Sequence, residues 1–292
     1  MEQNDNKSIS WLLKAYGFKF SKSKGQNFLI DKNIPEKIVR KSEIDKTYGV
    51  LEIGPGIGAL TAELAKTAGY VIAVELDKRL IPILSETLIG YSNVEIIQGD
   101  ILKTDILKLC KEKIQGSRLC VCANLPYNIT TPAITALLEV DIFESLTVMV
   151  QREVARRICA KPGTADYGAF SVYANYHADC EILFDVPPQC FVPRPKVFSS
   201  VLRLKPKPQK IPVEDLEQLF FRVTRAAFSQ RRKTLANALY SIFSHLMNKD
   251  DVINVITDSG FDSRIRGEAL NIENFIKVSE LLKKRIDEKA KL

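Results

Sequence analysis

The chain has few histidines, and its cysteines are not spaced as metal ligands. Among 292 residues there are two histidines, His177 and His245, and six cysteines, none of which forms a Cys-x-x-Cys pair. A structural zinc site needs closely spaced Cys and His ligands. The sequence therefore predicts no metal site.

Long hydrophobic runs are also missing. No apolar run reaches the ~18–20 residues that would cross a bilayer, and the first residues do not have the pattern of a secretory signal. We therefore expect a soluble, cytoplasmic protein with reduced thiols and no membrane partner. Cys120 and Cys122 alternate within the apolar run 119–123, which predicts that both are small core side chains.

Length and charge set broad limits on the organisation. A chain of 292 residues suffices for one substantial α/β domain and a smaller one. The formal net charge of +7 and the pI of about 9.0 favour a polyanionic partner, but only weakly. Monomer is the default expectation.

Strand and helix patterns alternate through the first two thirds of the chain. The apolar runs 48–53, 70–76, 94–98, 119–123 and 146–150 are nearly continuous, as expected for strands covered on both faces. Helical patterns at 58–66 and 78–88 separate the first three. This alternation predicts a Rossmann-like, doubly wound parallel sheet.

A proline-rich segment precedes a change to purely helical patterning. Two later strands, 181–186 and 198–204, are joined by the proline-rich stretch 187–195, and residues 205–212 are the best linker candidate. We therefore expect a catalytic domain over 1–205 and a small all-helical domain over 206–292.

A glycine-rich turn lies between the first strand and its helix. In Gly54-Pro55-Gly56-Ile57-Gly58 the glycines permit a tight turn, and the helix N-terminus offers N–H groups to a ligand. Because Ala59 follows, the segment also satisfies the dinucleotide fingerprint. The turn alone therefore leaves the nucleotide-like cofactor undecided.

Two carboxylates follow the next two strands. Glu75 is placed to accept hydrogen bonds from ribose hydroxyls, and Asp100 from an adenine amino group. The alternatives are a solvated carboxylate for Glu75 and a helix cap for Asp100. The carboxyl ends of parallel strands are where open α/β sheets bind ligands, which favours the binding interpretation.

The tetrapeptide Asn124-Leu125-Pro126-Tyr127 follows the fourth strand. The exocyclic amine of adenine is a poor nucleophile, and acceptors for its hydrogens help it to attack. The Asn124 side-chain oxygen and a main-chain carbonyl held by the Pro126 turn would supply two acceptors, and Tyr127 an aromatic face. A simple Asn-Pro turn is the alternative. After the cofactor turn, the segment favours methyl transfer to adenine, for which no histidine base is required.

These motifs resemble the ribosomal RNA adenine dimethyltransferase family, specifically its small-subunit branch. The resemblance extends from about Lys22 to about Asn271. Its motifs are 25–29, 52–61, 124–127, Tyr167-Gly168, 186–188, Phe191, Pro193, 195–197 and 227–235.

The resemblance implies a reaction and a set of site residues. The reaction is N6,N6-dimethylation of two adjacent adenosines in the 3′-terminal hairpin loop of 16S rRNA, within the 30S subunit or its precursor. S-adenosyl-L-methionine would be the donor and S-adenosyl-L-homocysteine the product. By the same resemblance, the cofactor contacts are Asn27, Leu29, Gly54, Gly56, Glu75, Asp100 and Asn124. Leu125 would offer its carbonyl, and Tyr127 and Phe191 would sandwich the base.

Basic residues gather after the linker. Arg222, Arg225, Arg231, Arg232 and Lys233 are predicted on one helix, where they would bind RNA phosphates, and Arg152, Arg156 and Arg157 on another. A solvated charged face is the alternative. Because the run 231–233 is not paired with acids at i,i+4 spacing, RNA binding is favoured.

Three other functions stay open. One is the large-subunit branch of the family, which confers macrolide resistance, and another is a DNA adenine methyltransferase, which typically carries a larger recognition domain. The third is a non-catalytic ribosome-assembly factor that keeps the fold. Gln230 to Lys233 and Leu125 favour the small-subunit branch.

Overall fold

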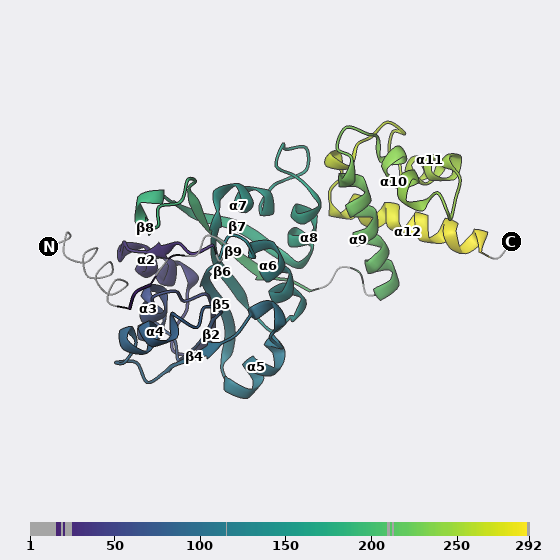
Figure 1. Cartoon of the computed structure of the whole chain (residues 1–292). Helices are drawn as coiled ribbons and strands as arrows, with labels where there is room; N and C mark the ends of the chain where they lie inside the picture. The colour runs from purple at the N-terminus through teal and green to yellow at the C-terminus, as the bar shows by residue number, and fades with distance from the viewer. Residues whose placement is uncertain are drawn as a thin grey trace. The chain divides into compact units, whose positions relative to one another are not determined.

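The computed structural model describes residues 16–18, 20, 25–114, 116–208, 211 and 213–290. The chain forms two compact units (Figure 1). The first comprises Met1–Ala155 and Cys180–Pro206, and the second comprises Arg156–Asp179 and Lys207–Leu292.

A seven-stranded sheet forms the centre of the first unit, in the order β4-β3-β2-β5-β6-β9-β7. Its strands are β2 (Tyr48–Ile53), β3 (Tyr70–Glu75), β4 (Val94–Gln98), β5 (Arg118–Asn124), β6 (Ser145–Gln151), β7 (Ala178–Val186) and β9 (Ser199–Pro206). The five strands β4, β3, β2, β5 and β6 pair in parallel, and β9 pairs antiparallel with β6. The predicted doubly wound sheet is confirmed.

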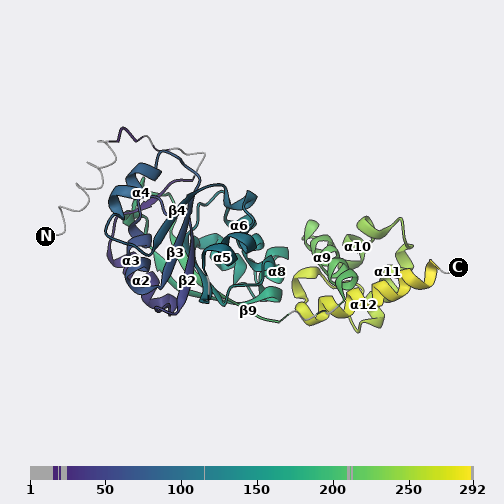
Figure 2. The same cartoon turned by 90° about the horizontal axis from the view of Figure 1, so that it is seen from below.

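Helices cover both faces of this sheet. In Figure 2, α3 (Ala59–Thr67) and α4 (Ile81–Thr87) lie on one side of the strands, and α5 (Ile106–Lys113) and α6 (Thr130–Glu139) lie on the other. The helix α2 (Asn33–Ser42) packs against α3. Because both faces are covered, β2 and β3 are buried over almost their whole length. Cys120 and Cys122 are fully buried among apolar side chains, as predicted.

A short two-stranded sheet carries residues from far apart in the sequence. The strand β1 (Phe28–Leu29) pairs antiparallel with β8 (Phe191–Val192), which follows the 3-10 helix η3 (Pro188–Cys190). The pairing places Leu29 opposite Phe191. It ties the segment that precedes α2 to the proline-rich loop.

The second unit is helical. Its helices are α8 (Ala169–His177), α9 (Glu214–Ser229), α10 (Leu235–Phe243), α11 (Lys249–Asp258) and α12 (Ile272–Lys289), with the 3-10 helix η4 (Gly267–Ala269). Their apolar faces share one core that contains Phe220, Phe243 and Phe275. The helix α7 (Arg152–Ile158) spans the sequence boundary between the units.

The units divide the chain differently from the expected division after residue 205. Arg156–Asp179 was expected in the first domain but belongs to the second unit. The reason is packing: Tyr167, Val172 and Tyr176 are buried in the same core as Phe220, and the Tyr176 hydroxyl donates to Glu217 at 2.7 Å. Of the predicted linker, Lys205 and Pro206 belong to β9, and residues 209, 210 and 212 lie outside the described residues.

Two kinds of structural feature are not found among the described residues. None of their helices has the length and hydrophobicity needed to span a membrane. Nor do three or more of their His, Cys, Asp or Glu side chains gather into a group that could hold a metal ion.

Candidate functional site

The glycine-rich turn joins β2 to α3 through backbone angles that suit glycine. Gly54 has φ of 68° and Gly56 has φ of 62°, a left-handed region that other residues seldom adopt. A Cβ atom on Gly56 would lie 2.9 Å from the Phe28 ring. The Gly54 N–H donates to the Val74 carbonyl at 2.9 Å, which fixes the turn against β3. The lack of a side chain at Gly56 therefore lets the turn lie directly against the Phe28 ring.

Glu75 ends β3 beside this turn and is 6% exposed. Its Oε2 accepts from the Gly56 N–H at 3.3 Å, and its Oε1 accepts from the Asp77 N–H at 2.7 Å. These bonds hold the carboxylate in place at the carboxyl edge of the sheet. A fixed carboxylate there can accept hydrogen bonds from ligand hydroxyls.

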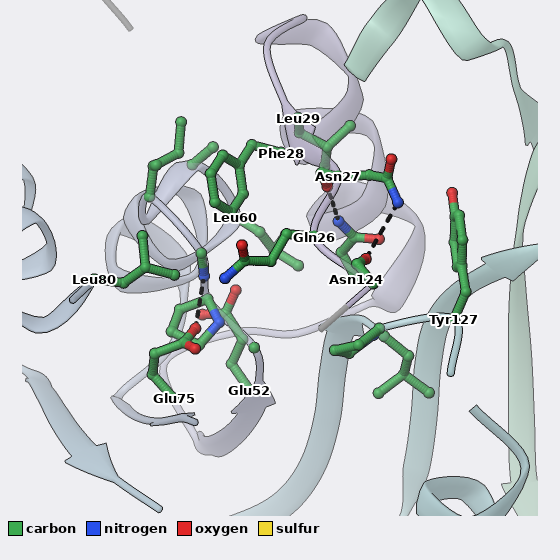
Figure 3. A pocket seen from close by; sticks show the side chains of 18 residues that line it. Gln26, Asn27, Phe28, Leu29, Glu52, Leu60, Glu75, Leu80, Asn124 and Tyr127 are labelled. Carbon is green, nitrogen blue, oxygen red and sulfur yellow. Dashed lines mark hydrogen bonds between the residues drawn. The ribbon is translucent and has the colours of Figure 1, made fainter. Parts of the chain in front are cut away.

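Residues 25–29, here named the strap, lie along the same edge. On one side Gln26 Nε2 donates to Asp77 Oδ2 at 2.9 Å. On the other, the Asn27 carbonyl accepts from Asn124 Nδ2 at 3.3 Å. Figure 3 shows Gln26, Asn27 and Asn124 converging on one pocket, with Glu75 beneath. The strap therefore links the cofactor turn to the residues after β5.

Asn124 ends β5, and the chain then turns into α6. The Leu125 N–H extends the sheet by donating to the Met149 carbonyl at 3.1 Å, and the Pro126 carbonyl accepts from the Ile129 N–H at 3.1 Å. Tyr127 is partly buried, and burial raises the pKa of its phenol while a hydrogen bond to Ser199 opposes the rise. The ring is therefore neutral near pH 7.

One pocket unites most of the predicted site. The space within it is about 590 Å³, part of which is open solvent. Nine predicted residues line it, namely Asn27, Leu29, Gly54, Gly56, Glu75, Asn124, Leu125, Pro126 and Tyr127.

Two of the residues predicted for the cofactor and base sites do not line this pocket. Asp100 accepts from the Leu102 N–H at 3.1 Å and caps the 3-10 helix η2 (Ile101–Lys103), which was the alternative considered for it. Phe191 is 2% exposed and packs with Leu29 and Met149 in the core. Its place opposite Leu29 in the β1–β8 pairing accounts for this burial.

Sequence reasoning did not single out Glu52 as a site residue. Glu52 is 1% exposed in β2, lines the pocket, and has an Oε2 atom without a hydrogen bond among the described residues. Burial raises the pKa of its carboxyl to about 8; the Thr61 hydroxyl opposes the rise and Glu75 adds to it. A glutamate inside an otherwise apolar strand was the available signal. Gln26 belongs to the motif 25–29 but was not predicted as a site residue, and no signal in the sequence indicated Ser199.

The sequence predicted the five basic residues after the linker on one helix, but in the structure they do not all lie on one helix. Arg222 and Arg225 are exposed on α9, but Arg231, Arg232 and Lys233 follow its end in a turn. The prediction of one helix was wrong because α9 ends at Ser229, five residues before the Thr234 cap of α10. Arg231 Nη2 donates to the Ala165 carbonyl at 2.6 Å, so this guanidinium also holds the second unit together.

The chain is similar in sequence to ribosomal RNA methyltransferases over nearly its whole length. The family described as Ribosomal RNA adenine dimethylase matches residues 17–283. A protein of Lachnoclostridium phytofermentans named Ribosomal RNA small subunit methyltransferase A is 49% identical over 290 residues, 98% of both chains. A Listeria monocytogenes protein of the same name is 46% identical over 282 residues, 95% of this chain and 96% of that one.

Two solved structures are similar to this one over 88% of the chain. A dimethyladenosine transferase from Plasmodium falciparum superposes with a TM-score of 0.75 at 26% identity, over 98% of its own chain. The 23S rRNA methyltransferase ErmE superposes with a TM-score of 0.66 at 25% identity, over 99% of its own chain.

Proposed function

The chain belongs to the ribosomal RNA adenine dimethylase family, and from that membership we propose that it dimethylates N6 of two adjacent adenosines in the 3′-terminal hairpin loop of 16S rRNA. It is an rRNA adenine N6,N6-dimethyltransferase. The observation that carries the assignment is the single pocket lined both by the Gly54–Gly56 turn with Glu75 and by Asn124 to Tyr127. In this proposal, the edge formed by the turn and Glu75 would bind the nucleoside part of the cofactor, and Asn124 to Tyr127 would hold the amine-bearing base.

The residues present fit S-adenosyl-L-methionine as the cofactor. Glu75 is held at the sheet edge to accept from ribose hydroxyls, and the turn exposes backbone to the ligand. Asn27, Leu29 and Asn124 would close the pocket from the other side. When bound, this cofactor supplies an electrophilic methyl group and leaves as S-adenosyl-L-homocysteine.

Asn124 and its neighbours would orient the target base. Because Asn124 Nδ2 donates to the Asn27 carbonyl, its Oδ1 is left to accept from the adenine amine. The Leu125 carbonyl would be the second acceptor, and the Tyr127 ring would stack on the base. Such placement of reactants can supply up to ~7–11 kcal/mol of the barrier reduction. Asp100 would contact adenine through Oδ2, which has no hydrogen bond among the described residues. Stacking by Phe191 would require its ring to leave the core.

Family membership and the basic residues of the second unit support RNA as the partner. The proposed substrate is 16S rRNA within the 30S subunit or its precursor, which would give the enzyme a role in subunit biogenesis. The basic residues of the second unit, Arg222, Arg225, Arg231, Arg232 and Lys233, would contact phosphates. We propose a monomer in the cytoplasm.

A second candidate is the large-subunit reaction, favoured by the similarity to ErmE. The small-subunit relatives are more similar in sequence, at 46–49% identity, and support the first proposal. The third is an assembly factor without transferase activity. The retained Glu75 and Asn124 in one pocket argue against it.

The experiment separates all three. Purified protein and isotopically labelled S-adenosylmethionine are incubated with small subunits that lack the modification, or with large subunits. Mass spectrometry of the digested RNA then maps N6,N6-dimethyladenosine. Adjacent dimethyladenosines in the 3′-terminal hairpin are expected. Transfer to large subunits alone would select the resistance reaction, and cofactor binding without transfer would select the assembly factor.

A further inference from the structure

The hydroxyls of Tyr127 and Ser199 lie 2.7 Å apart, although the residues are separated by 72 positions in the sequence. Tyr127 follows β5, and Ser199 is the first residue of β9. Because β9 is antiparallel to β6, it enters the sheet at the edge where the parallel strands end. Its first side chain therefore reaches the site edge.

Ser199 is a rigid anchor. The residue is fully buried, and its strand position is paired with Gln151 on β6. The preceding carbonyl, of Phe198, accepts from the Arg152 N–H at 2.9 Å. A hydroxyl on a fixed strand limits the freedom of its partner more than one on a loop does.

The Tyr127 ring needs such an anchor. Its hydroxyl lies at the far end of the side chain, on the axis about which the ring rotates, so a hydrogen bond there fixes the position of the ring. Because a phenol hydroxyl forms its hydrogen bonds preferentially within the plane of the ring, the direction of the bond to Ser199 also favours one ring plane. A stacked base follows the plane of the ring, and its amine must meet Asn124 Oδ1 at the same time. A small tilt would move the amine out of line, and misplacement of about 1 Å can lower a rate on the order of 10²-fold.

We propose that Ser199 is a positioning residue for methyl transfer, whose hydroxyl fixes the Tyr127 ring in the orientation that presents the adenine amine to Asn124. The inference rests on the proposed function. The Tyr127 hydroxyl then positions the ring, and the face of the ring stacks on the base.

The test is a double-mutant cycle of Ser199→Ala and Tyr127→Phe, assayed on small subunits that lack the modification. Each single change removes the same hydrogen bond, so kcat is expected to fall roughly three- to tenfold with little change in KM for the subunit. The double variant should be no slower than the slower single variant. Losses that multiply in the double variant would overturn the inference, because the two hydroxyls would then act separately.

Ser200→Ala is the matched control. Ser200 is equally buried on the same strand but bonds to Asp185 at 2.5 Å. We expect it to lower Tm and leave kcat unchanged, whereas Ser199→Ala lowers kcat at unchanged affinity for S-adenosylmethionine. If Ser200→Ala lowers kcat as much as Ser199→Ala, the effect is general strand destabilisation and the inference fails. If the wild-type protein itself transfers no methyl group, the proposed function fails instead.

Discussion

Asn124 Nδ2 donates to the main-chain carbonyl of Asn27 at a distance of 3.3 Å, across 97 positions of sequence. The bond joins the strap to the end of β5, and it uses the nitrogen of the Asn124 amide. The oxygen is thereby left for a donor in the pocket. One contact thus closes the cofactor side and orients the acceptor on the base side.

Replacement of Asn124 by alanine should nearly abolish methyl transfer while the fold remains. The change removes an acceptor for the adenine amine and the hydrogen bond to the Asn27 carbonyl of the strap. Loss of one such aligned hydrogen-bonding group lowers kcat on the order of 10²–10³-fold. Single-turnover transfer to unmodified small subunits measures the effect, and thermal unfolding measures the fold. Near-normal turnover would refute the role of Asn124.

Asn93→Ala is the control for this variant. The Asn93 side chain also donates to main-chain carbonyls, those of Ala65 and Ala68, but lies at the opposite edge of the sheet. We expect it to lower Tm and leave transfer unchanged. Equal losses of activity in both variants would mean that any broken amide contact in this domain impairs transfer.

Glu52→Gln should change how stability depends on pH. Burial raises the pKa of Glu52 to about 8, so the folded state binds a proton that the unfolded state releases above its ordinary pKa of 4.5. Stability therefore falls as pH rises from about 4.5 to about 8. The glutamine amide cannot ionise, so the free energy of unfolding of the variant should rise relative to that of the wild type across this range. The difference should reach on the order of a few kcal/mol at pH 8. Tm measured from pH 5 to pH 9 tests this, and parallel curves would contradict it.

Substitutions of Phe191 distinguish a role in the core from a role in stacking on the base. The ring is 2% exposed, so Phe191→Ala should lower the free energy of unfolding by roughly 3–5 kcal/mol. Phe198→Ala, at a residue that is 38% exposed, should cost far less. Phe191→Leu keeps an apolar side chain in the core and should preserve most of kcat. If Phe191→Leu unfolds normally but loses transfer, the ring stacks on the base during the reaction.

Much of the first unit could be predicted because its local patterns agree with its packing. The continuous apolar run 48–53 became β2 with unchanged bounds, since a strand covered on both faces needs no polar alternation. The glycine turn was predictable because its angles exclude most other residues. Seven of the nine predicted residues that line the pocket come from motifs at strand ends, whereas Asn27 and Leu29 came from the family resemblance.

Long-range packing accounts for what the sequence did not reveal. Nothing near Tyr167 indicates that its hydroxyl donates to the Leu270 carbonyl at 2.9 Å, 103 positions away, which is why residues 156–179 were expected in the first domain. The burial of Phe191 depends on its pairing with Leu29 in the same way. Ser199 gains its partner Tyr127 from the antiparallel direction of β9, which its own sequence does not specify.

Two arginines of the basic group should differ in what their loss does. Arg225 is exposed on α9, and its side chain makes no hydrogen bond or ion pair with the residues that the structure describes. Arg231 Nη2 donates to the carbonyls of Ala165 and Tyr167, at 2.6 Å and 3.2 Å. Arg225→Ala should therefore leave Tm unchanged and reduce the slope of log affinity against log salt by about 1, the loss of one phosphate contact. Arg231→Ala should lower Tm whether or not the slope changes. Filter binding to small-subunit RNA over a range of potassium chloride concentrations gives the slope, and an unchanged slope for Arg225→Ala would remove that residue from the RNA interface.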